Sequence, residues 1–133
     1  IPCTYADFIA QKGKVCPIQQ SVSTNGVPFI IANDNGTNYY FYPNIWGNDN
    51  FDQELSVYWL VEIKITDGAY RFGWKKIGVG STRSEVDYAY RRNLTCYEAE
   101  GLGSGYIDGD WLYIRFLYDQ FDKVTQMTIT LEL

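Results

Sequence analysis

Apolar and polar side chains alternate along several segments of this chain, which is the pattern of a half-buried β-strand. The clearest example is the last segment, where Thr125, Met127, Ile129 and Leu131 share the face that we expect to be buried. Other strand candidates are rich in β-branched and aromatic residues. We predict strands over residues 27–33 and 37–43, which the turn signal Asp34-Asn35-Gly36 joins into a hairpin. We also predict strands over residues 55–66, 94–100, 111–119 and 123–133, a brief pairing at 106–107 and an extended approach over 69–79.

Two segments change to a helical pattern, and each begins with a capping signal. Thr4 precedes an apolar face and has Asp7 three positions later, a favourable place for a negative charge. Gly13 marks the end of this first helix, and we expect a loop after it. Thr82 and Glu85 have the spacing of a capping box, in which each side chain accepts a hydrogen bond from the other residue's backbone N–H. This spacing predicts a second helix.

The glycine-rich corner IGVGSTRSEV, residues 77–86, also suggests three kinds of functional loop, and each lacks a required residue. A phosphate-binding P-loop needs a lysine beside its last glycine. A dinucleotide-binding loop needs a third glycine, where this chain has Arg83. A nucleophile elbow needs a histidine, and the chain has none. We therefore expect that Gly80 only lets the chain bend into a helix over about residues 83–92.

These elements predict an α+β fold in which two short helices pack on a curved antiparallel β-sheet. A length of 133 residues fits a single domain, residues 1–133. Its halves, residues 1–68 and 69–133, both pass from a threonine-capped helix to an aromatic strand and then to an alternating strand. We interpret this similarity as a degenerate tandem repeat of helix-plus-hairpin units.

Composition limits the chemistry that the chain can perform. The absence of histidine removes the commonest general base and the commonest zinc ligand. We therefore predict no catalytic residue, no metal site and no cofactor, and a carboxylate-based hydrolase is the weakest alternative. The acidic run NDNFDQE, residues 48–54, lacks the glycine and the bidentate glutamate of a calcium loop. A net charge of −5 argues against nucleic acid or an anionic membrane as a partner.

Aromatic residues make up 17% of the chain and are dense over residues 39–51. On a strand, Tyr39 and Phe41 share one face, and Tyr40 and Tyr42 share the other. We expect one face to be core and the other to bind a protein partner, with a carbohydrate as the alternative ligand. The alternative to a binding surface is that helix and loop cover both faces. The binding residues that we predict are Tyr40, Tyr42, Trp46 and Phe51.

Three cysteines, Cys3, Cys16 and Cys96, allow one disulfide and one free thiol. We expect the disulfide to join Cys3 and Cys16, because a short helix between them can fold back and bring their Cα atoms within reach. Three buried thiols are the alternative.

Two stretches of the second half carry a resemblance to a known group of proteins. They are GAYRFGWKKIGVGSTRSEVDYAY, residues 68–90, and YIDGDWLYIRFLYDQFDKVTQMTI, residues 106–129. A helix start leading to Glu85-Val86, followed by a C-terminal hairpin, resembles small bacterial envelope and secreted proteins. The fold that goes with this pattern resembles that of the β-lactamase-inhibitor protein and the outer-membrane assembly lipoprotein. The likeness covers about residues 63–133, although Tyr90 is followed here by arginine where the family often has glycine.

The resemblance implies a non-enzymatic role in the cell envelope or outside the cell, often the binding of another protein. We accordingly expect a secreted or envelope protein of bacterial origin, with an inhibitor or an immunity protein as the leading examples. The chain has no apolar run of transmembrane length. It starts at Ile1 rather than methionine, so we expect that an N-terminal segment is removed, with a lipid anchor as one option.

Overall fold

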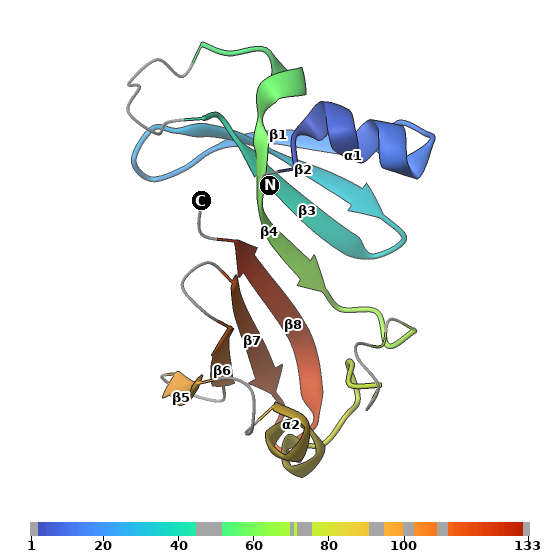
Figure 1. Ribbon diagram of the computed structural model, residues 1–133, viewed down its shortest axis with the longest axis vertical. Coiled ribbons are helices and arrows are strands. Elements are labelled where there is room, and N and C mark those ends of the chain that lie inside the picture. Colours follow the sequence, from blue (N-terminus) through green and yellow to red (C-terminus); the bar gives the residue numbers. More distant parts are fainter. Residues whose placement is uncertain are drawn as a thin grey trace. The chain divides into compact units, whose positions relative to one another are not determined.

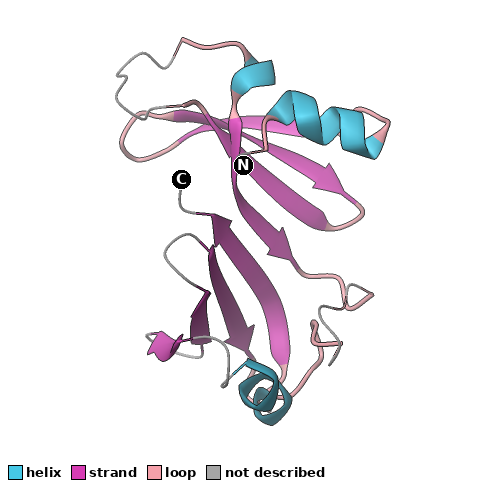
Figure 2. Cartoon of the chain, viewed as in Figure 1, coloured by secondary structure: helices cyan, strands magenta, loops and turns pink. Residues whose placement is uncertain are grey.

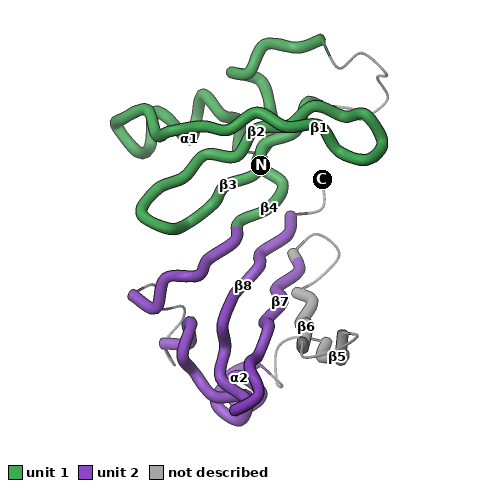
Figure 3. The backbone as a smooth tube through the Cα atoms, turned by 180° about the vertical axis from the view of Figure 1, so that it is seen from behind, with its two compact units in different colours: residues 1–63, 133 green, residues 64–132 purple. Residues whose placement is uncertain are grey.

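The computed structural model describes residues 3–44, 52–69, 71, 76–90, 95–99, 103–108 and 112–131 of the chain. It confirms an α+β structure with two α-helices and antiparallel β-strands (Figure 1). The chain divides into two compact units, residues 1–63 with residue 133, and residues 64–132 (Figure 3). In each unit one helix is followed by strands that lie beside one another in chain order (Figure 2).

The described part of the first unit holds one α-helix and most of four strands. The β2–β3 turn places Asn35 and Gly36 at φ angles of 51° and 87°, which is the left-handed backbone of a tight hairpin turn. The hairpin expected around this turn is therefore confirmed, with antiparallel pairing of β2 and β3. The elements are α1 (Tyr5–Lys12), β1 (Ile18–Val22), β2 (Pro28–Asp34), β3 (Thr37–Tyr42), the short 3-10 helix η1 (Leu55–Val57) and β4 (Trp59–Ile65), which crosses the division between the units.

Strand β1 occupies a segment that we expected to be a loop. Its sequence, IQQSV, has no alternating apolar face, and four of its five residues are exposed. It is a strand because β2 offers an antiparallel partner along its whole length, from Ile18 opposite Ala32 to Val22 opposite Pro28. Strand β4 also starts later than expected, because Val57 and Tyr58 donate N–H hydrogen bonds within the η1 turn instead of to a ladder.

Helix α1 packs on one face of the β2–β3 hairpin, as the ribbon shows (Figure 1). The Phe8 and Phe41 ring centroids lie 5.2 Å apart, and the Tyr5 and Phe41 centroids are also 5.2 Å apart. Phe41 has no exposed surface, and Ile30 and Ala32 are buried beside it. The helix therefore buries aromatic rings on the sheet, and this stabilises the first unit because it removes apolar surface from water.

In the described part of the second unit, one helix is followed by four strands. Val86 of its helix is fully buried, and Tyr90 lies with its ring centroid 5.4 Å from that of Phe116. Antiparallel pairing joins β5 to β6, β6 to β7 and β7 to β8. The elements are α2 (Arg83–Tyr90), β5 (Thr95–Ala99), β6 (Gly103–Asp108), β7 (Leu112–Tyr118) and β8 (Val124–Leu131).

A bulge shifts the buried face of β8. Leu117 pairs with Gln126 but Tyr118 pairs with Val124, so Thr125 is an extra residue on its strand. Val124 and Met127 are consequently both buried, whereas strict alternation would put them on opposite faces. The predicted burial is confirmed for Met127 and wrong for Thr125, which is exposed.

The start of α1 is held on the last strand of its own unit. Thr4 caps the helix through a full capping box with Asp7. The N–H of Tyr5 donates to the carbonyl of Tyr58 at 2.8 Å, and the N–H of Leu60 donates to the carbonyl of Cys3 at 2.8 Å. These two bonds flank an antiparallel bridge between the capping threonine and Trp59.

The start of α2 is held in the same way. The N–H of Arg83 donates to the carbonyl of Asp122 at 2.8 Å, and the N–H of Val124 donates to the carbonyl of Ser81 at 2.8 Å. An antiparallel bridge joins Thr82 to Lys123 between them. The capping box predicted from the sequence is present, because Glu85 and the threonine exchange backbone N–H hydrogen bonds of 3.1 and 3.2 Å.

The disulfide expected between Cys3 and Cys16 is not formed, and both residues are free thiols. Cys3 is held at the start of β4 by the bond from Leu60, whereas Cys16 follows the far end of α1. The carbonyl of Pro17, the residue after Cys16, accepts the N–H of Asn33 at 3.0 Å, so the two cysteines are tied to different strands, β4 and β2.

We predict that Thr82→Ala lowers the free energy of unfolding by about 1 kcal/mol, because the Glu85 N–H then loses the threonine hydroxyl oxygen that accepts its hydrogen bond. Thr4→Ala should have a similar effect on the first helix. Urea denaturation monitored by circular dichroism measures both. Thr82→Ser keeps the accepting oxygen and serves as the control. Equal stability of the alanine and serine variants at this position would contradict a capping role.

Candidate functional site

The face of the first unit's sheet that points away from α1 carries a row of aromatic rings. Strand alternation places Phe29, Tyr40 and Tyr42 opposite to the buried Ile30 and Phe41. The Phe29 and Tyr42 centroids are 5.0 Å apart with planes at 19°, and those of Phe29 and Tyr40 are 6.2 Å apart at 26°. All three side chains are half-buried. We call these three residues the aromatic face.

The predicted binding residues divide between this face and the part of the chain outside the described residues. Tyr40 and Tyr42 belong to the aromatic face, whereas Trp46 and Phe51 lie outside the described residues. Tyr39, the neighbour of Tyr40, lies on the helix side, with its ring centroid 4.7 Å from that of Phe8. Sequence reasoning missed Phe29, because its place beside the tyrosines depends on the register between β2 and β3.

The aromatic face offers hydroxyl groups rather than charges. Burial raises the pKa of Tyr42, and the nearby Glu62 carboxylate and Tyr40 raise that pKa further. The phenol therefore stays protonated well above neutral pH and can donate a hydrogen bond. At the other end of the hairpin, Asn33 donates an amide hydrogen bond of 2.8 Å to Asn38. Apolar rings with polar tips suit a surface that exchanges water for another molecule.

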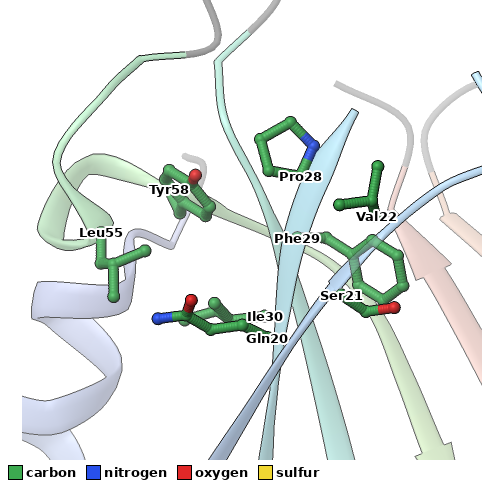
Figure 4. Close-up of a pocket in the computed structure, with 8 residues that line it drawn as sticks. All are labelled: Gln20, Ser21, Val22, Pro28, Phe29, Ile30, Leu55 and Tyr58. Atoms are coloured by element: carbon green, nitrogen blue, oxygen red, sulfur yellow. The ribbon is translucent and has the colours of Figure 1, made fainter. Parts of the chain in front are cut away.

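A pocket of about 220 Å³ lies in the first unit beside β1 (Figure 4). Its described lining contains no carboxylate, lysine or cysteine, so these residues supply no general acid or base near neutral pH. The pocket is a hollow suited to an apolar side chain. The residues that line it are Gln20, Ser21, Val22, Pro28, Phe29, Ile30, Leu55 and Tyr58.

Asp34 joins the end of α1 to the β2–β3 hairpin through two lysines. Its carboxylate lies 2.8 Å from Lys12 Nζ and 3.1 Å from Lys14 Nζ, and its side chain is only 9% exposed. The hydrogen bond from Lys12, followed by that from Lys14, holds the pKa of Asp34 below its ordinary value. The Lys12 ammonium also donates to the Tyr39 hydroxyl at 3.4 Å. A carboxylate that is held ionised by two ammonium groups is a poor proton acceptor, so this cluster has a structural role.

The glycine-rich corner before α2 has its polar groups committed to structure. Ser81 is buried, and its hydroxyl oxygen accepts hydrogen bonds from the Gly78 N–H at 3.0 Å and from Arg71 Nη1 at 3.1 Å. Gly80 has a φ angle of 96°, which few other residues adopt. The carboxylate of Glu85 already accepts at the helix start. This agrees with the expectation that the corner launches a helix.

The described part of the chain also bears on metal binding and on membrane crossing. There, no group of three or more histidine, cysteine, aspartate or glutamate residues is arranged to hold a metal ion. No helix in the same residues has the length and apolar character needed to cross a membrane. At the β7–β8 turn, the Asp119 carboxylate accepts N–H hydrogen bonds from Phe121 and Lys123 at 2.8 and 3.0 Å. That carboxylate therefore rigidifies the turn.

Compared with protein-family models, with curated proteins and with solved structures, the chain matches none of them. The resemblance drawn from the sequence accordingly rests on its quoted stretches alone, and the site is defined by its own geometry.

We predict that Asp34 makes stability depend on pH in the acid range. Because its pKa is lower in the folded protein than in the unfolded chain, its contribution is fully present above the ordinary aspartate value of about 3.9 and is lost as pH falls through the folded value. Thermal unfolding of the wild type and Asp34→Asn over a pH series should therefore show two curves that converge on acidification. Lys12→Met should weaken the same dependence. Parallel wild-type and Asp34→Asn curves would contradict it.

Proposed function

We propose that this chain is a non-catalytic protein that binds a protein partner through the aromatic face. The observation that carries the proposal is the stacked arrangement of Phe29 with Tyr40 and Tyr42, half-exposed on the side of the sheet that α1 leaves uncovered. Aromatic rings with hydroxyl tips are enriched in protein interfaces, where they bury a large area at a small cost in side-chain entropy. We propose that Trp46 and Phe51, which follow β3 in the chain, also take part in this binding.

The acidity of the chain indicates which charge the proposed partner should carry. The net charge is −5, so a basic protein would be drawn to it by long-range attraction. An inhibitor or an immunity protein directed against a basic enzyme or toxin fits this description. The resemblance to small envelope and secreted proteins supports the same role, and we propose that the chain acts in the bacterial envelope or outside the cell.

We also infer that the two units are copies of one helix-plus-strands motif. Both helices have eight residues, and both are capped by a threonine with an acidic residue three positions later. Both are also held on a strand by the same pair of backbone hydrogen bonds. This support is geometric, and it agrees with the tandem pattern read from the sequence. Such a duplication would give the second unit its own helix-free face.

A carbohydrate ligand is the second candidate. Stacked rings attract the apolar faces of sugars, and Tyr42 adds a neutral hydroxyl for a hydrogen bond. However, Phe29 and Tyr42 are stacked on each other with planes at 19°, so part of each ring face is already covered. A protein partner, which also uses ring edges, is favoured for this reason.

Photo-crosslinking can test the proposed surface. We predict that p-benzoylphenylalanine at position 42 captures a partner from the source organism, whereas the same group at Phe121, an exposed aromatic of the second unit, does not. With the captured partner purified, replacing both Tyr40 and Tyr42 by alanine should weaken the Kd by about 30-fold or more, as expected for aromatic hot spots.

Three controls make this experiment decisive. Phe121→Ala should leave the Kd unchanged, Tyr42→Phe separates the hydroxyl from the ring, and melting curves must show that each variant is folded. A partner that crosslinks only at position 121, or an unchanged Kd in the double alanine variant, rejects the aromatic face. Binding to a glycan array that disappears in the same variant would establish the carbohydrate alternative instead.

A further inference from the structure

Strand β1 is the outermost strand of the first unit. It begins the strand order and pairs with β2 on one side. Its register with β2 runs without a shift from Ile18 to Val22. Ile18 and Val22 are 39% and 63% exposed. An open strand edge of this kind presents backbone donors and acceptors to any extended chain that can approach it.

The hydrogen bonds at both ends of β1 show which of its residues have backbone groups facing outward. The N–H of Asn33 donates to the carbonyl of Pro17 at 3.0 Å, and the N–H of Ser23 donates to the carbonyl of Val27 at 2.8 Å. Residues bonded to one neighbour alternate in an antiparallel ladder, so Gln19 bonds toward β2 in the same way. The even-numbered residues of the strand therefore direct N–H and C=O away from β2. They are Ile18, Gln20 and Val22.

Proline at position 28 supports this assignment independently. Val22 lies opposite Pro28, which has no N–H to donate. A non-bonded pair needs no N–H from either residue on that side, so proline opposite Val22 agrees with its place in the non-bonded set on the β2 side. Its backbone groups are thus available on the outer edge.

The strand lacks three of the devices that commonly protect an edge. Natural edge strands are commonly shielded by a charged side chain, an internal proline or a bulge. No charged residue occurs anywhere between Lys14 and Asp34, although charged residues make up 20% of the chain. The strand itself contains no proline, and its register has no bulge. An edge without these devices is suited to pairing with another strand.

The sequence of β1 is complementary to itself. If two copies pair antiparallel about a two-fold axis through Gln20, Ile18 of each copy lies opposite Val22 of the other. All three outward-facing residues are then paired, with about six hydrogen bonds across the junction. The two exposed apolar side chains cover each other, and no like charges meet. Because the chain carries a net charge of −5, copies repel one another over most approaches and are least repelled where their surfaces are neutral.

We propose that the chain forms a two-fold symmetric dimer by antiparallel pairing of β1 with β1 of a second copy, centred on Gln20. The pocket beside β1 adds a place for the incoming side chain, because Val22 lines it together with Pro28 and Leu55 (Figure 4). Ile18 of the second copy, lying opposite Val22, reaches the mouth of this pocket. The inference concerns the strand edge and does not depend on the proposed role of the aromatic face.

Sedimentation velocity over a wide range of protein concentrations tests the dimer. We expect a shift from monomer to dimer as concentration rises. On the two-fold axis residue 20 meets its own copy, so Gln20→Lys and Gln20→Glu should each remain monomeric, because like charges face each other. An equimolar mixture of the two variants should restore a dimer. This rescue requires the register centred on residue 20.

The same substitutions at Gln120 are the matched control. Gln120 is an exposed residue of the β7–β8 turn, and Gln120→Lys and Gln120→Glu should dimerise like the wild type. Hydrogen exchange gives a second readout, in which the amides of Ile18, Gln20 and Val22 become protected only at dimer-forming concentrations. The amides of Gln19 and Ser21 should be protected in monomer and dimer alike.

Each contrary result rejects the proposal. A wild-type chain that stays monomeric at all concentrations, with rapid exchange at the three outward amides, rejects it. A dimer that survives Gln20→Lys, or one that leaves those amides unprotected, uses another surface and also rejects it. A strand from a different protein that pairs with β1 while the chain alone remains monomeric would replace the second copy as occupant.

Discussion

The pairing of each helix start with the last strand of its own unit is the constraint on which this structure depends. A capped helix end still has backbone groups to satisfy, and here two of them bond to a strand instead of to water. In the first unit Tyr5 and Cys3 supply these groups, and in the second unit Arg83 and Ser81 supply them. These backbone hydrogen bonds fix the position of the helix along the strand, and side-chain packing then decides which rings are buried. The burial of Phe41 under α1 and of Phe116 under α2 follows from this anchoring.

Features that depend on neighbouring residues in the chain were predicted from the sequence. Both capping threonines, the glycine that ends α1 and the tight turn at Asn35 are local signals, and the structure has each of them. The division of the tyrosines of β3 between two faces follows from strand geometry alone. The sequence could not say which face is buried, because that depends on where α1 lies.

Features that depend on a distant partner were missed or misplaced. Strand β1 has no apolar periodicity of its own, and only the ladder offered by β2 makes it a strand. The bulge at Thr125 arises from the register of the β7–β8 turn, so simple alternation misplaced Val124. The expected disulfide is not formed: Cys3 is tied to β4 through Leu60, and the residue after Cys16 is tied to β2 through Asn33. The candidate site shows the same limit, since Phe29 joined the two tyrosines only through strand register.

The anchoring of the helix starts also has a consequence for how the chain is made. The residues that fix α1 include Tyr58 and Leu60, which leave the ribosome long after the helix itself. Helix and hairpin can form early, but the anchoring of the helix start waits for a contact of high sequence separation, and such contacts slow folding. A nascent chain that stops short of Trp59 holds the helix and the hairpin but lacks the strand to which the helix start is bonded. The anchoring of each helix is therefore complete only after the last strand of its unit has been synthesised.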